Sequence, residues 1–291
     1  MKKIIVIGSG FGGLSIASRL RSRGFDATIL EKQPDLGGRA RTFVHNGYKY
    51  DAGPTVITAP YLIDELFSIH SEKLSDYVNL LPVTPWYRFL FDNGEYLDYG
   101  DKLNKTIREI KSKYGYKNAK SYIRLLKHSK RIFNKAFTEL SDEPFESIGS
   151  MVKHLPELIR IRFDRSVYKA VDKYMGNKYL NQALSMHPLL VGGNPYSTTS
   201  IYLLIQYLEW KWGVYYAEGG TGTVIQGLEK LLISKNVEIK KNTEAHKIIV
   251  EKNKVIGVET EAGIIKCDGV VCNSDPCLLY TSPSPRDCRL S

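Results

Sequence analysis

A glycine-rich turn between a short apolar run and a helical pattern constrains this sequence more than any other feature. The run KIIVI at residues 3–7 predicts a buried strand, and the segment GSGFGG at residues 8–13 follows it directly. Apolar side chains then recur at helical spacing until Gly24, and residues 27–30 supply a second strand. A strand, a helix and a second strand in this order predict a parallel sheet with a right-handed crossover.

The glycines of this turn predict a dinucleotide site. Gly8 allows a tight turn, Gly10 lets the backbone approach a pyrophosphate, and Gly13 lets the helix pack closely on the strand. Phe11 and Gly12 complete the loop, whose N–H groups and helix N-terminus stabilise phosphate charge. At the end of the second strand, the carboxylate of Glu31 can accept hydrogen bonds from a ribose, which favours a dinucleotide with an unphosphorylated adenosine ribose.

A second glycine pair decides between NAD and FAD. Gly37, Gly38 and Arg39 lie in the segment LGGRAR, a few residues after Glu31 and Lys32. The order of GSGFGG, the Glu-Lys pair and GGRAR resembles the FAD-binding amine oxidase and carotenoid desaturase superfamily. The resemblance implies FAD as the cofactor, with these residues contacting it and the arginine near the pyrophosphate. An NAD-dependent dehydrogenase, the other dinucleotide enzyme considered, conflicts with this segment.

Three further segments narrow the resemblance to the bacterial-type phytoene (carotenoid) desaturases. They are YDAGPT at residues 50–55, HPLLVGGNPY at 187–196, and WGVYY at 212–216 followed by GGTG. The resemblance covers residues 1–276. It implies that Gly53, Pro54 and Thr55 pass close to the isoalloxazine ring, and that Ala245 offers backbone contacts to the adenine.

The implied activity is the FAD-dependent desaturation of phytoene or a related carotene, with quinone or oxygen reoxidising the flavin. A hydrocarbon has no carbonyl to polarise, so alignment and an apolar tunnel suffice while the flavin accepts a hydride. No Ser/His/Asp or paired-carboxylate pattern occurs, His187 is expected to be structural, and Arg165 is the one catalytic candidate. The alternatives are another carotenoid-modifying flavoenzyme, either an isomerase or a desaturase of another carotene, or a catalytically incomplete fragment.

The predicted fold is α/β, with a discontinuous Rossmann-like FAD-binding domain and an inserted, mainly helical substrate and membrane domain. We expect the FAD-binding domain at residues 1–72 and 213–276, and the insert at 73–212. Asn-Gly pairs predict two hairpins, at Asn46 and at Asn93. A helical pattern covers residues 103–207, and a strand is expected at 212–217.

Charge is concentrated in the insert. The net charge is +10, and residues 101–180 hold 19 Lys and Arg against 9 Asp and Glu, so the rest of the chain is balanced at 22 against 22. Such a block is either a solvated helical face or a surface for nucleic acid or acidic lipid. The carotenoid resemblance favours lipid over nucleic acid, because a carotene enters from a bilayer. With no apolar run long enough to span a membrane, we expect a cytoplasmic protein, peripheral on the inner face of the membrane.

The last residues differ from the rest of the chain. All four cysteines occur after residue 266, without zinc spacing, so no metal site is predicted. Residues 277–291, CLLYTSPSPRDCRLS, have the composition of a non-native tail, resembling translated adapter or vector sequence. Members of the resembled family continue into a C-terminal glycine-rich FAD segment. We therefore expect this chain to be C-terminally truncated, to bind FAD weakly and to turn over no phytoene.

Overall fold

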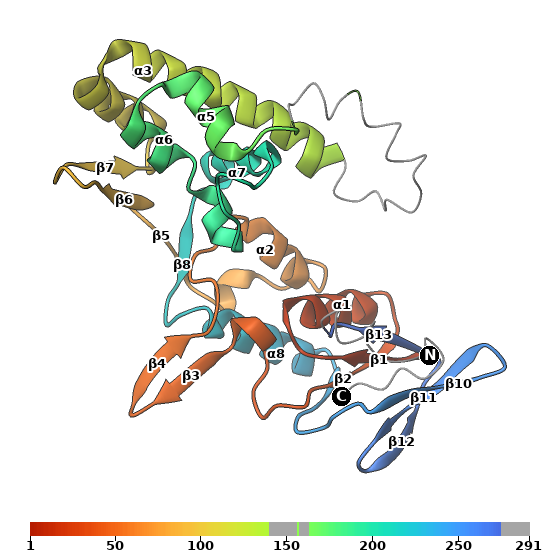
Figure 1. Ribbon diagram of the computed structural model, residues 1–291. Coiled ribbons are helices and arrows are strands. Elements are labelled where there is room, and N and C mark those ends of the chain that lie inside the picture. Colours follow the sequence, from red (N-terminus) through yellow and green to blue (C-terminus); the bar gives the residue numbers. More distant parts are fainter. Residues whose placement is uncertain (140–155, 157–162, 275–291) are drawn as a thin grey trace. The chain divides into compact units, whose positions relative to one another are not determined.

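The computed structural model describes residues 1–139, 156 and 163–274 (Figure 1). The chain divides into two compact units, one formed by Met1–Leu81 with Tyr216–Ser291 and the other by Pro82–Tyr215. The domain boundaries expected from the sequence lie after residues 72 and 212, whereas the two units of the structure divide after Leu81 and Tyr215. The tail at residues 277–291, including Cys277 and Cys288, lies outside the described residues.

A parallel sheet forms the centre of the first unit, as the glycine turn and its flanking strands predict. Its four strands lie in the order β13-β1-β2-β9, and each neighbouring pair is parallel. Their bounds are Lys3–Ile7 for β1, Asp26–Leu30 for β2, Glu238–Lys240 for β9 and Gly269–Cys272 for β13. The strands from both ends of the sequence share one sheet, so the unit is discontinuous in the chain.

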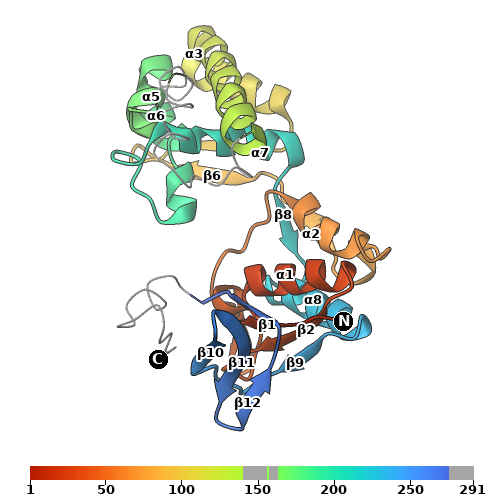
Figure 2. The same cartoon turned by 90° about the vertical axis from the view of Figure 1, so that its right-hand side faces the viewer.

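Helices cover one face of this sheet and a second sheet covers the other (Figure 2). The helices are α1 (Phe11–Ser22) and α8 (Gly222–Ser234), and the second sheet is the antiparallel meander β10 (Lys247–Glu251), β11 (Lys254–Thr260) and β12 (Gly263–Lys266). Successive residues of β1 face opposite sides. Val6 packs in the cluster that contains the helices, whereas Ile5 and Ile7 pack in the cluster that contains the meander. Burial on both faces explains why β1 is apolar from Ile4 to Ile7.

The remaining elements of this unit are short. The hairpin of β3 (Thr42–His45) and β4 (Tyr48–Asp51) turns at Asn46 and Gly47, which both have positive φ, and this confirms the Asn-Gly prediction. Helix α2 spans Pro60–Ser68, and 3₁₀ turns span Gly38–Ala40 and Leu74–Asp76. Strands β5 (Leu80–Pro82) and β8 (Tyr215–Ala217) pair with each other where the chain passes between the units.

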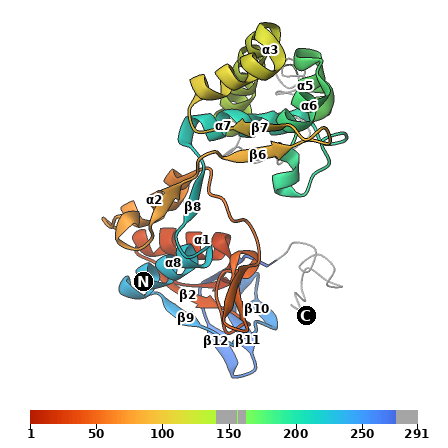
Figure 3. The ribbon, with the colours of Figure 1, turned by 90° about the vertical axis from the view of Figure 1, so that its left-hand side faces the viewer.

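The second unit combines helices with one hairpin (Figure 3). The helices are α3 (Leu103–Phe133), α5 (Val167–Met175), α6 (Lys178–Leu184) and α7 (Leu204–Trp212), with a π-helical segment at Asn134–Glu139 and 3₁₀ turns at His187–Val191 and Ser200–Leu203. Gly115, with φ 86°, breaks α3 into two parts. The hairpin of β6 (Tyr87–Leu90) and β7 (Tyr96–Tyr99) confirms the prediction from Asn93. Aromatic side chains of the hairpin pack against α7. This aromatic packing forms the core of the unit.

The strand predicted for residues 212–217 is wrong at its start. Trp212 ends helix α7, and the strand begins only at Tyr215. Gly213 separates them with φ 83°, a conformation that terminates the helix. The Trp212 ring lies 5.4 Å from the ring of Phe133 and 5.7 Å from that of Phe137, so tertiary packing holds this residue in the helix.

Candidate functional site

The phosphate loop lies between the end of β1 and the start of α1. Gly8, with φ 91°, donates its N–H to the Leu30 carbonyl at 2.8 Å, which ties the turn to the end of β2. A Cβ on Gly13 would lie 2.0 Å from the Gly8 carbonyl oxygen, so helix and strand are in direct backbone contact. Helix α1 has no side-chain cap and no acidic residue in its first turn. Its N–H groups are therefore suited to bind an anion such as a pyrophosphate.

The second glycine pair lies directly against this loop. Gly37 forms a bridge with Gly10 and donates its N–H to the Ser9 carbonyl at 3.0 Å. A Cβ on Gly38 would lie 3.3 Å from the Cα of Gly10. Both residues of the pair have positive φ, which favours glycine at these positions. Two glycine segments far apart in the sequence thus form one backbone cradle, and this cradle fits the pyrophosphate of a dinucleotide.

Arg39 follows the cradle in the 3₁₀ turn Gly38–Ala40. Its side chain is exposed and forms no hydrogen bond or ion pair with the described residues. Phe11 and Gly12 begin α1 on the other side of the cradle. A free guanidinium beside a set of backbone N–H groups is suited to bind phosphate oxygens.

Glu31 lies at the end of β2 and is buried. One carboxylate oxygen accepts hydrogen bonds from the Ser9 N–H at 2.9 Å and the Ser9 hydroxyl at 2.6 Å, and the other accepts from the Gln33 N–H at 2.9 Å. A carboxylate offers about four acceptor positions, so it retains capacity for a ribose hydroxyl. The exposed Lys32 lies 3.9 Å from Glu244. Ser9, which the sequence reasoning passed over, thus connects the phosphate loop to the acidic residue.

The segment that contains Ala245 runs beside Glu31. The Thr243 N–H donates to the Glu31 carbonyl at 2.8 Å, and the Asn242 N–H donates to the Gln33 carbonyl at 3.3 Å. Ala245 itself is buried in the apolar cluster under the meander. The structure therefore brings this segment to the same end of the site as Glu31.

The loop with Gly53, Pro54 and Thr55 lies on the far side of Arg39. The Ala52 N–H donates to the Arg41 carbonyl at 3.0 Å, and a Cβ on Gly53 would lie 2.2 Å from the Arg39 carbonyl oxygen. Residues 52–55 are exposed. The loop is therefore packed against the GGR turn and presents free surface beside it.

Asn273 is a site residue that the sequence reasoning missed. It follows β13, and its N–H donates to the Ile7 carbonyl at 2.8 Å. Its side chain lies over the phosphate loop, since a Cβ on Gly12 would be 2.3 Å from its Oδ1 and one on Gly10 would be 3.1 Å from its Nδ2. The sequence signal that could have identified Asn273 was its position directly after a strand, because the carboxyl ends of parallel strands meet at one edge of a sheet.

Arg165 belongs to the second unit. It precedes α5, whose N-cap is Ser166, and its carbonyl accepts the Ser200 N–H at 2.7 Å. Its side chain is half-buried and forms no ion pair with the described residues. Among the described residues around it, no feature indicates catalysis.

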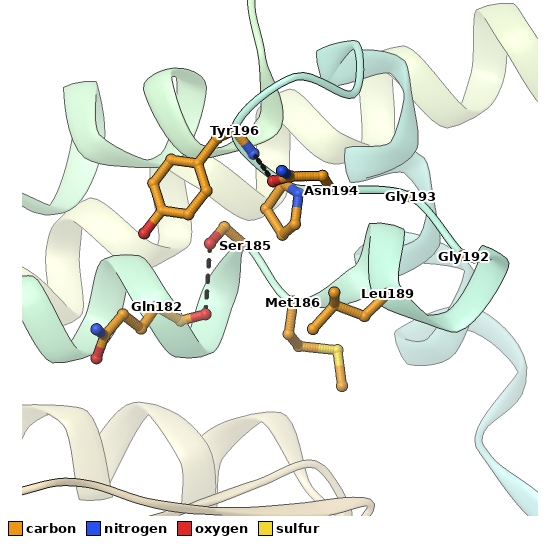
Figure 4. Close-up of a pocket in the computed structure, with 9 residues that line it drawn as sticks. Gln182, Ser185, Met186, Leu189, Gly192, Gly193, Asn194 and Tyr196 are labelled. Carbon is orange, nitrogen blue, oxygen red and sulfur yellow. Dashed lines mark hydrogen bonds between the residues drawn. The ribbon is translucent and has the colours of Figure 1, made fainter.

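A pocket of about 590 Å³ opens in the second unit (Figure 4). Met186 and Leu189 point toward it from one side, and Gln182 and Ser185 lie at the end of α6 on another. The remaining lining residues are Gly192, Gly193, Asn194, Pro195 and Tyr196. Leu189 and Tyr196 are both 61% exposed, so the mouth of the pocket is apolar. Such a surface is suited to an apolar ligand.

His187 lies beside this pocket in sequence but is buried in the core. Its Nε2 is 3.1 Å from Glu209, whose other carboxylate oxygen accepts a hydrogen bond from the Tyr87 hydroxyl at 2.7 Å. Burial, with the nearby Glu209 carboxylate, raises the pKa of Tyr87 well above its usual value. The hydroxyl therefore stays protonated and donates to the carboxylate.

Residues 1–139, 156 and 163–274 contain neither a candidate metal site nor a helix that could span a membrane. No three His, Cys, Asp or Glu side chains there are grouped to hold a metal ion. In the same part of the chain, every helix is too short or too polar to cross a bilayer.

The fold and the double glycine cradle define a dinucleotide-binding protein, and comparison with known families shows that it is a flavoprotein. Residues 11–290 match the family of flavin containing amine oxidoreductases, and the chain belongs to this family. The match confirms FAD, the cofactor that the glycine segments indicate.

Individual relatives are more specific. The chain is 39% identical to a phytoene desaturase (lycopene-forming) from Pseudescherichia vulneris over 276 residues, or 94% of this chain and 56% of that protein. It is also 39% identical to a phytoene desaturase (lycopene-forming) from Pantoea ananas, over 90% of this chain and 53% of that protein. The chain thus spans about half the length of these curated relatives.

Among solved structures, an oxidoreductase from Methanosarcina mazei has the same fold. The TM-score is 0.63 at 19% identity, covering 93% of this chain and 58% of that one.

Proposed function

We propose that this chain provides the ADP-binding part and a substrate-contacting part of an FAD-dependent carotenoid desaturase acting on phytoene or a related carotene. The observation that carries the proposal is the contact between the two glycine segments, Gly37 and Gly38 against Gly10. A single phosphate loop serves many dinucleotide enzymes, whereas the second segment adds a backbone wall for an extended dinucleotide. The names of the relatives supply the substrate class.

In this proposal each part of the cradle binds one part of FAD. The pyrophosphate lies on the N–H groups of Gly10, Phe11, Gly12 and Gly13 at the start of α1, with Arg39 beside it. Glu31 accepts hydrogen bonds from the ribose. The other residues proposed to contact the cofactor are Gly8, Lys32, Gly37, Gly38, Gly53, Pro54, Thr55 and Ala245.

The chemistry asks little of the side chains. Bound flavin supplies a hydride acceptor, and a hydrocarbon requires no general acid. The chain contributes alignment and apolar contact, for which the Met186 and Leu189 side of the pocket is suited. Quinone or oxygen is the electron acceptor in this proposal.

A membrane surface supplies the lipid-soluble substrate. Helix α3 carries many exposed basic side chains, among them Lys117, Lys120 and Lys127. Anionic headgroups attract such a surface. We therefore place the protein on the inner face of the membrane as a peripheral protein.

Expression in phytoene-accumulating cells, followed by pigment chromatography and spectroscopy of the purified protein, tests the proposal. Bound flavin together with newly desaturated carotenes is the expected result for an active form that includes this chain. An isomerised product with an unchanged number of double bonds would instead assign an isomerase. Protein without flavin, or with reduced nicotinamide in its place, would overturn the proposal.

A further inference from the structure

The loop at residues 52–55 is anchored by groups from two distant segments. Asp51, the last residue of β4, accepts a hydrogen bond from the Thr42 hydroxyl at 2.8 Å through Oδ1. Through Oδ2 it accepts the backbone N–H of Thr221 at 3.0 Å. The Thr221 hydroxyl in turn donates to the Pro54 carbonyl at 2.5 Å. Both ends of the loop are therefore tied to the start of α8.

Glycines make this approach possible. A Cβ on Gly220 would lie 2.8 Å from both carboxylate oxygens of Asp51, and one on Gly222 would lie 2.1 Å from the Thr42 Oγ1. Thr221 is the N-cap of α8, and the helix has neither a side-chain cap nor an acidic residue in its first turn. Asp51 supplies the negative charge that a helix N-terminus favours. The Asp51 carboxylate thus contacts the GGTG segment at the N-terminus of α8.

The anchored loop continues a path that begins at the phosphate loop. The Gly38 backbone lies against Gly10, and Gly53 lies against the carbonyl of Arg39, the next residue after Gly38. Three backbone segments thus follow one another outward from the start of α1. A dinucleotide with its pyrophosphate at the first segment would extend along the others, and the exposed residues 52–55 form the last of them.

We propose that Asp51 is a positioning residue for the flavin: by holding Thr42 and Thr221 it fixes residues 52–55 where the isoalloxazine half of FAD binds. The inference rests on the proposed function, since it assigns one residue's part in the same cofactor site. Asp51 touches the cofactor only through the loop that it holds. It therefore affects the flavin half of the ligand and leaves the ADP half unchanged.

Comparing FAD with ADP as probes tests this directly. Calorimetry with the 291-residue chain measures both affinities, and the absorbance spectrum of bound FAD reports the surroundings of the ring. Asp51→Ala removes both hydrogen bonds, whereas Asp51→Asn retains an oxygen for the Thr221 N–H and an amide for the Thr42 hydroxyl. Asp64→Ala, at an exposed position on α2, is the matched control.

We expect Asp51→Ala to weaken FAD binding about tenfold, shift the spectrum of bound FAD and leave ADP affinity within about twofold. Asp51→Asn should recover most of the loss. If Asp51→Ala lowers the affinities for FAD and ADP by the same factor, so that their ratio is unchanged, the inference is overturned. If the unmodified chain binds ADP but gains nothing from the flavin half, the positioning role fails while the dinucleotide site stands. If it binds neither probe, the proposed function fails as well.

Discussion

Replacing Gly13 by alanine measures how closely α1 packs on the phosphate loop. The new Cβ would lie 2.0 Å from the Gly8 carbonyl oxygen, while ordinary contact begins at 3.4 Å, so the backbone must separate by 3.4 − 2.0 = 1.4 Å. The obstructing atom belongs to the backbone of the turn, and rotation of a side chain does not relieve the clash. Overpacking of this kind costs about 3 kcal/mol. That corresponds to a fall of about 6 to 12 °C in Tm.

Gly12→Ala is the matched control, because both positions lie in the first turn of α1 and gain the same helix propensity from alanine. At Gly12 the new Cβ meets Oδ1 of Asn273, the end of a half-buried side chain that can rotate away. We expect a loss of about 1 kcal/mol or less. Adding Asn273→Ala to Gly12→Ala should remove that loss, which a double-mutant cycle detects as non-additivity.

Thermal unfolding followed by circular dichroism, together with calorimetric titration of ADP, measures both effects. Gly13→Ala should lower Tm and abolish ADP binding, since a displaced helix start no longer aims its N–H groups at the phosphates. If Gly13→Ala and Gly12→Ala unfold at the same temperature and bind ADP equally, the contact between helix and turn does not constrain this site.

Three further predictions concern charge and protonation. Glu31→Gln should lower ADP affinity more than about tenfold and reduce stability by about 1 to 3 kcal/mol, because either orientation of the amide places an N–H against a donor; titration and melting curves showing no change would contradict this. Burial raises the pKa of Tyr87 above its ordinary 10.0, so the stability it contributes is present below about pH 10 and is lost as the pH rises further. Urea unfolding should therefore show a shallower alkaline loss for Tyr87→Phe than for the unmodified chain, and identical slopes would refute the assignment. Replacing three exposed lysines of α3 by glutamine should weaken binding to anionic vesicles more than about 100-fold, at about 1 kcal/mol each, and added salt should reproduce the effect. Those lysines are Lys117, Lys120 and Lys127, and the matched control replaces Lys252, Lys254 and Lys266 in the meander. Equal binding of the unmodified chain to neutral and anionic vesicles in flotation would eliminate the electrostatic part.

The features that the sequence alone determined are those with a local physical cause. A strand, a glycine turn, a helix and a second strand are contiguous, so residues 3–30 predicted this unit and the parallel pairing of its strands correctly. The Asn-Gly pairs at Asn46 and Asn93 predicted both hairpins for the same reason, because the turn type depends on residues at the turn. Family resemblance extended this to FAD, through motifs that are themselves short and contiguous.

Tertiary structure decided how these motifs meet. Asp51 and Thr221 are 170 positions apart, and only the placement of α8 brings them within a hydrogen bond. Asn273 reaches the phosphate loop because β13 pairs with β1, an order that no local pattern specifies. Trp212 was assigned to the wrong element, since its ring contacts with Phe133, rather than its neighbours in sequence, keep it helical. Periodicity and turn signals act over a few residues, whereas sheet order and ring packing depend on the whole fold.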